Sequence, residues 1–404
     1  MTLFAPVSGV LAGLLLGCCT CAAGEVHVGG FGATPGDGRD DTAAVRAAIA
    51  HCTTTEGGRL VFAPGRYDFF AREGEPSSLP VCGAKRIAIT GDDTQLIFHG
   101  LTGGFRFEGC LGGTVSGLTS DWARPPFSVG RVLRAEERRF DIAVDKAFPV
   151  DGAEPVEAFL EYDAESRLPA HGGLDVYDQV EGVELLEPQV LRLRLRSTHR
   201  ATPGRLMVLR HAVYGYNAFA FRNCTRVDLR DVTIHTCPGM GVYCVDSEDI
   251  AVERLRVCIK PETPRLMSTT ADATHFNNCA GTVRMRDCLF EGMGDDAANF
   301  HGMFLSVVRR AGDRAVIAQH KRGFDILPRV GDRVEFTCVK NLLPFAEGVV
   351  AAVEANPEQN LHRIAFEDAL PDSLERQDLL ANVTRIPQVR VSGCTVRGNR
   401  GRGF

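Results

Sequence analysis

Residues 227–234 read VDLRDVTI, and apolar residues alternate with polar ones along this stretch. The alternation returns in residues 250–257 (IAVERLRV), 283–290 (VRMRDCLF) and 389–396 (VRVSGCTV), with the first two copies at successive offsets of 23 and 33 residues. A period of two is typical of a β-strand with one buried face. Its return every few tens of residues is typical of a parallel β-solenoid, in which each unit buries its apolar face against the next.

The phrases that precede two of these strands also match one another. Phe221-Arg222-Asn223-Cys224 stands before the first strand, and Phe276-Asn277-Asn278-Cys279 stands before the third. A β-sandwich has alternating strands too, but it gives no reason for Asn-Cys to recur at the same phase. We therefore predict an all-β chain folded as a right-handed parallel β-helix, with rungs stacked about 4.8 Å apart.

Two stretches lack the strand copies and divide the chain. Residues 128–212 and 304–386 contain other strands and hairpin-like turns, and we interpret them as inserted small β-barrel-like modules, because solenoids tolerate insertions on one face. Residues 24–127 then hold an N-terminal cap and the first rungs, and residues 213–303 hold the central rungs with the active site. Residues 387–404 form a further rung.

The two ends of the solenoid need covers. Asp40 and Asp41 precede apolar residues at helical spacing, so we expect one of them to be the N-cap of a capping helix. No cap sequence follows the rung that ends near Phe404. We therefore expect the chain to be truncated and to associate through its uncovered C-terminal rung.

The first residues look like an export signal. An apolar run, residues 7–17, leads into small residues that suit signal peptidase near Ala23, so residues 1–23 are interpreted as a signal peptide. Residues 15–18 resemble a bacterial lipobox, which would make Cys18 a lipid-anchored N-terminus. We expect a secreted, periplasmic or outer-surface lipoprotein.

Composition excludes several classes of partner. The 404 residues carry 51 acidic and 45 basic side chains, a net charge of −6, and give no basic footprint for nucleic acid. Contact with a membrane is expected only through the lipid anchor. Eleven cysteines remain after the signal peptide, without a CxxC pair, so we expect most of them to be small buried hydrophobes and leave one or two disulfides open.

One acidic stretch stands out chemically. Aligning the rungs places Asp295 and Asp296 opposite Gly239 and Met240, and discounting the extra residues 260–270 brings Asp272 to nearly the same phase. Three carboxylates on one face repel one another, which raises one pKa and keeps a proton available near neutral pH. A glycosidase needs such a protonated acid beside a carboxylate that activates water.

The neighbours of the three aspartates are candidates for binding. Gly239 and Gly294 are expected to leave room for a ligand beside the carboxylates. His275, Asn299 and His301 are candidates for contacts to sugar hydroxyls, with satisfied structural roles as the alternative. The spacing of the histidines matches no zinc motif, so we expect neither a metal nor a cofactor.

Two motifs resemble a known family. Asp272-Ala273-Thr274-His275-Phe276 and the stretch from Gly294-Asp295-Asp296 to His301-Gly302 look like the core of glycoside hydrolase family 110, the bacterial exo-acting α-1,3-galactosidases. The resemblance implies a β-helix with β-barrel insertions, hydrolysis with inversion, and an oligosaccharide or glycoconjugate substrate with terminal galactose, such as blood group B or linear structures. It also implies that Asp295 is the general acid and that Asp272 and Asp296 share the role of general base. Inversion in turn implies about 6.5–9.5 Å between acid and base carboxyls.

Other functions stay open at this point. A glycosidase of the polygalacturonase type also uses three aspartates on neighbouring rungs, although its Asn-Thr-Asp, Gly-His-Gly and Arg-Ile-Lys motifs are not found here. A polysaccharide lyase would need a calcium cluster and an Arg or Lys base. A non-catalytic β-helix that binds carbohydrate, such as an adhesin, is the third alternative. Family members also run well past the point where this sequence stops, with later rungs that contribute to the galactose pocket.

Overall fold

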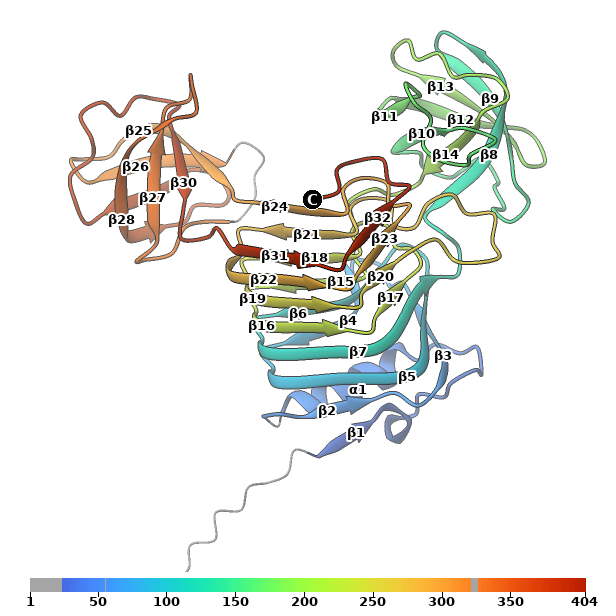
Figure 1. Ribbon diagram of the computed structural model, residues 1–404, viewed down its shortest axis with the longest axis horizontal. Coiled ribbons are helices and arrows are strands. Elements are labelled where there is room, and N and C mark those ends of the chain that lie inside the picture. The colour runs from blue at the N-terminus through green and yellow to red at the C-terminus, as the bar shows by residue number, and fades with distance from the viewer. Residues whose placement is uncertain (1–23, 55, 321–325) are drawn as a thin grey trace, which may run out of the picture.

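The chain folds as a parallel β-helix, which confirms the predicted class (Figure 1). The computed structural model describes residues 24–54, 56–320 and 326–404, and the predicted signal peptide with Cys18 lies outside them. Two parallel sheets form the walls of the helix, one of thirteen strands and one of six. Within the described ranges, the structure contains no helix with the length and apolarity needed to cross a membrane.

The strands of the two walls follow one another from rung to rung. The thirteen-stranded sheet contains β1 (Glu25–His27), β2 (Arg59–Val61), β3 (Gly65–Phe70), β5 (Lys85–His99), β7 (Leu111–Trp122), β16 (Thr225–Arg230), β17 (Thr233–Ile234), β19 (Glu248–Glu253), β20 (Arg256–Val257), β22 (Ala280–Arg286), β23 (Leu289–Glu291), β31 (Gln388–Ser392) and β32 (Thr395–Arg397). The six-stranded sheet contains β4 (Ser77–Cys82), β6 (Gly103–Glu108), β15 (Phe219–Arg222), β18 (Val242–Val245), β21 (Thr274–Asn277) and β24 (Ala298–His301).

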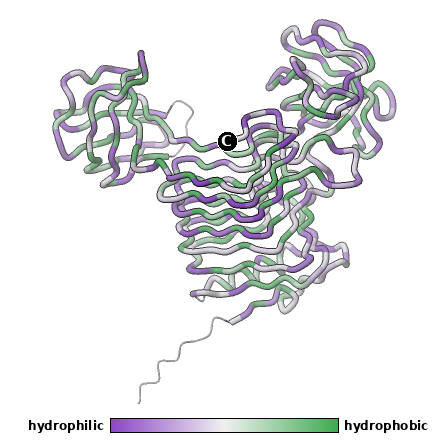
Figure 2. Tube along the Cα trace, viewed as in Figure 1, coloured by the Kyte–Doolittle hydropathy of each residue, from purple (hydrophilic) through white to green (hydrophobic). Residues whose placement is uncertain are grey.

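The four copies found in the sequence lie side by side in one wall. Val227 of β16 pairs with Ile250 of β19, Ile250 with Val283 of β22, and Val283 with Val389 of β31. Because the ladders are in register, each inward residue packs on its counterpart in the next rung. In β16 the buried Val227 and Leu229 alternate with the more exposed Asp228 and Arg230, and Figure 2 shows hydrophobic and hydrophilic residues following one another along the rungs. The aromatic pair Phe107 and Phe221 shows this stacking, with ring centroids 4.6 Å apart.

The recurring Asn-Cys phrase marks a corner of the helix. Asn223, Asp246 and Asn278 stand at equivalent positions after β15, β18 and β21, and each has a φ of 52°. Among non-glycine residues, Asn and Asp tolerate this left-handed conformation best. The residues that follow Asn223 and Asn278 are the buried Cys224 and Cys279, small enough for the interior of the corner.

The two stretches without strand copies fold as separate β-structures on either side of the rung stack (Figure 1). The first is an open antiparallel sheet of β8 (Phe127–Glu136), β9 (Arg139–Val144), β10 (Ala158–Tyr162), β11 (Asp175–Tyr177), β12 (Val180–Glu187), β13 (Val190–Leu195) and β14 (Leu206–Arg210). The second is a closed barrel of β25 (Phe304–Arg310), β26 (Ala315–His320), β27 (Arg333–Thr337), β28 (Pro344–Glu354), β29 (His362–Phe366) and β30 (Leu379–Asn382). We call them the first and the second module.

The N-terminal cap is a helix, as predicted, but its start is built differently. A 3-10 turn, η1 (Val28–Phe31), precedes the helix α1 (Thr42–Thr53), whose buried face joins the core of the β-helix. Asp41 stands at the N-cap, yet its carboxylate accepts hydrogen bonds from the N–H groups of Thr34 and Asp68. The expectation that the Asp41 side chain caps the helix was therefore wrong, because this side chain joins the N-terminal segment to β3. The carboxylate of Asp40 instead accepts the N–H of Thr42 at 2.9 Å.

The cysteines behave as the sequence predicts. All eleven cysteines in the described ranges are free thiols, and eight of them are buried. Among the described residues no disulfide forms, and the thiols serve as small apolar side chains of the core.

Candidate active site

The register of the six-stranded sheet brings the three aspartates together. Thr274 of β21 pairs with Ala298 of β24, so Asp272 and Asp296 lie at the same phase on neighbouring rungs. The N–H of Ala273 donates to the carbonyl of Asp296 at 2.9 Å and continues the ladder through the site. One oxygen atom of each carboxylate of Asp272, Asp295 and Asp296 lies within 4.8 Å of the others.

This spacing is tighter than the expectation from the inverting mechanism. That mechanism implies about 6.5–9.5 Å between acid and base carboxyls, with the water on the opposite side of the sugar. Here the distance follows from the stacking of neighbouring rungs and brings oxygens of all three groups within 4.8 Å. The expected separation is therefore not found between these oxygens, and inversion stays a prediction that rests on the resemblance alone.

Two of the three carboxylates are buried among hydrogen-bond donors. Asp272, 3% exposed, lies 2.6 Å from Nδ1 of His275 and accepts the N–H of Asp296 at 3.1 Å. Asp296, 4% exposed, accepts the N–H of Arg402 at 2.5 Å, and the Arg402 guanidinium stands 4.0 Å from the same oxygen.

Asp295 has a different environment. Its side chain accepts a long hydrogen bond from the hydroxyl of Tyr214 at 3.3 Å. Burial, followed by repulsion from Asp272 and Asp296, raises the pKa of Asp295 to about 6. Its raised pKa suits Asp295 to the role of proton donor, whereas Asp272 and Asp296 each accept hydrogen bonds from backbone N–H groups.

The predicted histidines form a chain that ends on Asp272. Nε2 of His275 lies 2.8 Å from Nε2 of His301, and Nδ1 of His301 lies 2.9 Å from the carbonyl oxygen of Gly302. With the bond to Asp272, three protons are needed on four ring nitrogens, so the pair carries one positive charge when all three bonds form. Burial is the largest cause that lowers the pKa of His301. Asn299 pairs with His275 across the ladder and is half-buried on the same outward face.

The glycines of the site have other roles than expected. A Cβ at Gly239 would stand 2.0 Å from the carbonyl oxygen of Tyr216, and one at Gly294 would stand 2.5 Å from that of Thr270. Backbone from the neighbouring segment already fills this space, so these glycines permit close packing and the expectation of ligand room beside them was wrong. The glycine that faces the carboxylates is Gly401, where a Cβ would stand 2.4 Å from Oδ1 of Asp296.

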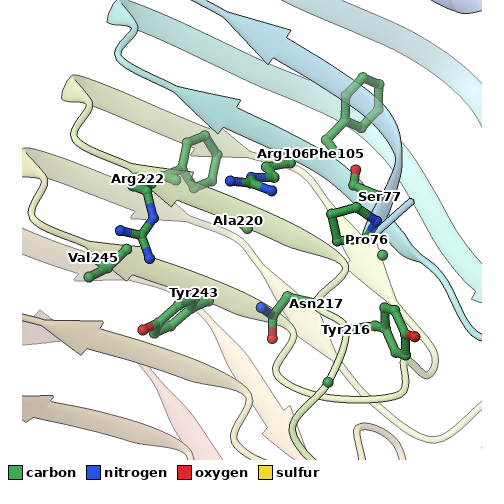
Figure 3. A pocket seen from close by; sticks show the side chains of 13 residues that line it. Pro76, Ser77, Phe105, Arg106, Tyr216, Asn217, Ala220, Arg222, Tyr243 and Val245 are labelled. Carbon is green, nitrogen blue, oxygen red and sulfur yellow. The ribbon is translucent and has the colours of Figure 1, made fainter. Parts of the chain in front are cut away.

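A column of residues on the outer face of the six-stranded sheet connects the site to a pocket nearer the N-terminal cap. Arg106, Ala220, Tyr243, His275 and Asn299 follow one another across neighbouring strands in one outward column. A pocket is lined by the first three of these residues together with Tyr216, Asn217 and Arg222 (Figure 3). The pocket therefore lies on the face of the site, a few rungs nearer the N-terminal cap.

Sequence reasoning missed three contributors: Tyr214, Gly401 and Arg402. Tyr214 comes from the link between the first module and β15, and the other two from the segment after β32. None of them belongs to a repeated strand, so the repeat does not predict where on the β-helix they lie. The only signal in the sequence is the glycine-rich run near the final rung, which is typical of a turn.

The three carboxylates also lie close enough together to ligate a cation. Oxygen donors of this kind suit calcium or magnesium, which prefer carboxylate ligands. The hydrogen bonds from His275 and from the Arg402 amide already engage oxygens of Asp272 and Asp296. The metal-free site stays a prediction, and the dependence of activity on a chelator tests it.

Fold and site together define a class. A parallel β-helix that holds three carboxyl groups on one face, one of them with a raised pKa, has the chemical groups of a glycoside hydrolase. The comparisons with known proteins agree with this class. No family model matches the chain.

The chain is similar to curated bacterial galactosidases. The Alpha-1,3-galactosidase A of Shewanella woodyi is 28% identical over 428 residues, which cover 96% of this chain and 70% of that protein. The Alpha-1,3-galactosidase B of Akkermansia muciniphila is 26% identical over 415 residues, which cover 94% of this chain and 51% of that protein. The chain thus spans between half and seven tenths of these two relatives, which confirm the resemblance to glycoside hydrolase family 110.

Solved structures with a similar fold include two glycosidases. The family 28 exopolygalacturonase of Yersinia enterocolitica is 13% identical and aligns with a TM-score of 0.35 over 72% of this chain and 46% of that chain. The family 87 α-1,3-glucanase of Streptomyces thermodiastaticus is 16% identical and aligns with a TM-score of 0.31 over 69% of this chain and 32% of that chain.

Replacing Asp272 by asparagine should lower the pKa of Asp295. The substitution removes one of the two charges that repel the ionised form of Asp295, while burial still acts on it. The measurement is a pH titration of ¹³C-labelled aspartate carboxyls by NMR, with Asp228→Asn on the outer face of β16 as the control. A pKa of Asp295 that stays the same or rises in Asp272→Asn would contradict the proposed repulsion.

Proposed function

We propose that this protein is an exo-acting α-1,3-galactosidase that removes terminal α-1,3-linked galactose with inversion. The observation that carries the proposal is the division of roles among the three carboxylates. Asp295 has a pKa raised to about 6, while Asp272 is held by Nδ1 of His275 and Asp296 accepts the N–H of Arg402. The names of the similar proteins supply the sugar and the linkage.

In the proposed reaction Asp295 donates a proton to the glycosidic oxygen as the bond to the anomeric carbon breaks. Asp272 and Asp296 hold a water molecule and remove its proton while its oxygen attacks that carbon. His275 holds the carboxylate of Asp272 in position through Nδ1, and Nε2 of His275 lies 2.8 Å from Nε2 of His301. A water molecule and an intact glycoside are consumed, and galactose and the shortened glycan are released.

The pocket on the same face as the site supports an oligosaccharide substrate. Tyr243 offers a ring face to a sugar, and Asn217 and Arg222 offer polar groups to hydroxyls. We propose that the leaving part of the glycan extends along this outward column from the carboxylates. Asn299 contacts the galactose or its neighbour, and His275 and His301, whose ring nitrogens are engaged with Asp272, with one another and with Gly302, can contribute only ring surface to that contact.

We further propose that the protein works outside the cytoplasm. The apolar N-terminal segment, residues 7–17, and the lipobox-like residues that end at Cys18 support export and a lipid anchor. A glycan with terminal galactose is a substrate found on cell surfaces and in secreted material. Radiolabelled palmitate that labels the wild-type protein and spares Cys18→Ser tests the anchor.

The activity is tested with galactosyl-α-1,3-galactose and with a blood group B oligosaccharide. We expect hydrolysis of at least one of them, with β-galactose as the first product in the NMR spectrum, and equal rates with and without a chelator. Release of α-galactose would contradict inversion, and loss of activity in chelator would contradict the metal-free site. An unsaturated product would identify a lyase, and binding without any hydrolysis would identify a carbohydrate-binding protein.

Asp295→Asn should depress turnover selectively. Without a general acid, glycosides with poor leaving groups should lose about 10²- to 10⁴-fold in rate, whereas activated aryl galactosides scarcely need protonation. Because the acid must be protonated, wild-type activity on the disaccharide should also fall as pH rises through about 6. Equal losses on both kinds of substrate would assign the acid role to another residue.

Gly401→Ala should damage the site without unfolding the chain. The added methyl group meets Oδ1 of Asp296 at 2.4 Å and also reaches Asp295, so the carboxylates must move. A displacement of about 1 Å can cost about 100-fold in rate. Gly403→Ala is the matched control, because a Cβ there meets nothing within 4 Å. Equal kinetics for the two variants would show that Gly401 does not set the position of the carboxylates.

A further inference from the structure

Tyr214 reaches the acid from outside the β-helix. It lies on the link between the first module and β15, is 52% exposed, and donates its hydroxyl to Oδ2 of Asp295 at 3.3 Å. The residue before it, Val213, is fixed on both sides of its backbone. Its N–H donates to Glu157 at 2.9 Å, and its carbonyl accepts the hydroxyl of Thr270 at 3.2 Å. The backbone that carries Tyr214 is therefore held by the first module and by the loop that carries Asp272.

A buried cation supports the tyrosine from behind. The ring of Tyr214 lies parallel to that of Tyr177, with 6.4 Å between centroids and 9° between planes. The guanidinium of Arg210 lies 4.5 Å from the Tyr177 ring and donates to the Tyr177 hydroxyl at 3.1 Å. Arg210 has no exposed surface, forms an ion pair with Asp175 at 2.9 Å, and donates to the carbonyl of Thr270 at 3.2 Å.

These contacts form a continuous series from Arg210 of the first module to the carboxyl group of Asp295. Arg210 and Tyr177 belong to strands β14 and β11 of the module, and neither touches the carboxylates in the described part of the chain. A fully buried arginine is costly unless its charge is satisfied, and here Asp175, the Tyr177 hydroxyl and the Thr270 carbonyl satisfy it and fix the guanidinium behind Tyr177. The last contact in this series is the hydrogen bond from the Tyr214 hydroxyl to Oδ2 of Asp295, and the other oxygen, Oδ1, lies near Gly401.

We propose that Tyr214, held in place by Tyr177 and Arg210 of the first module, is a positioning residue that directs the proton of Asp295 onto Oδ1. The inference rests on the proposed galactosidase function. A protonated carboxyl has one oxygen that accepts and one that carries the proton. When the Tyr214 hydroxyl donates to Oδ2, the proton resides on Oδ1, and the first module thereby orients the acid of the β-helix.

The groups around the acid make the role measurable. Asp295 faces the carboxylates of Asp272 and Asp296, the hydroxyl of Tyr214 and, further away, the charge of Arg210. The Tyr214 hydroxyl favours the ionised form of Asp295, whereas the two carboxylates oppose it. Partial burial, with Tyr177 and Asp295 nearby, raises the pKa of Tyr214, so its hydroxyl stays a donor throughout the working range.

The test compares Tyr214→Phe with Tyr162→Phe. Tyr214 is half exposed, so its loss of a hydroxyl should leave the fold intact, and the hydroxyl of Tyr162 is buried in the first module with no hydrogen-bond partner among the described residues. On galactosyl-α-1,3-galactose, Tyr214→Phe should lose about 10- to 100-fold in kcat/KM, the range expected when a hydrogen bond to a reacting charged group is removed. The loss of its activity on the alkaline side of the pH profile should occur at higher pH than in the wild-type protein, because the hydroxyl that favours ionised Asp295 is absent. Tyr162→Phe should match the wild-type protein in both respects.

A double variant shows whether Tyr214 acts through the acid. In an Asp295→Asn background, measured on an activated aryl galactoside, adding Tyr214→Phe should change the rate by less than about twofold. A full further loss there, or an unmoved alkaline limb in the single variant, would overturn the proposal and leave Tyr214 as a contact to substrate.

The ¹³C titration of Asp295 in Tyr214→Phe tests the same role without turnover. A raised pKa of Asp295 supports the proposal, and an unchanged pKa contradicts it. If the wild-type protein hydrolyses no galactoside while this titration moves, the proposed function fails and the positioning role stands.

Discussion

The parallel ladder in strict register is the constraint on which the rest of the molecule depends. Once Val227 pairs with Ile250 and Ile250 with Val283, every side chain is stacked over its counterpart about 4.8 Å away. The stacked apolar residues form a continuous core. Acidic residues at equivalent positions of neighbouring rungs are also brought close together, in spite of the repulsion between like charges. The proximity of Asp272 and Asp296 is a direct product of the ladder, and the donors around them compensate for it by hydrogen bonding.

The ladder alone does not finish the site. The extra residues 260–270 leave the rung and pack against the first module, where Leu266 and Met267 join its core. Arg265 pairs with the buried Asp121 of β7 at 2.7 Å and fixes the same loop to the β-helix. Asp272 follows directly after this loop, so its position depends on packing in two separate cores.

How much the sequence predicts depends on which residues follow the repeat. The fold and the meeting of Asp272 with Asp296 follow from periodic strands, and the closeness of His275 and His301 follows from their place on those strands. Tyr214 and Arg402 come from links whose course is set by tertiary packing, so periodicity gives them no phase. The predicted roles of Asp41 and Gly239 were wrong because a local sequence pattern indicates only a helix cap or an open space. It does not show which distant segment bonds to the Asp41 side chain or fills the space beside Gly239.

The places where the modules leave the β-helix have a consequence for how the chain reaches its fold. Phe127 at the start of β8 pairs with Arg210 at the end of β14, and Phe304 at the start of β25 pairs with Ala381 of β30. Each module thus brings its own two ends side by side. An unfolded segment of that length would impose a loop-closure entropy on the next rung, and that cost grows with the logarithm of its length. A folded module replaces the long loop with a short bridge, so a module that is already folded lowers the entropy cost of joining the rungs that flank it.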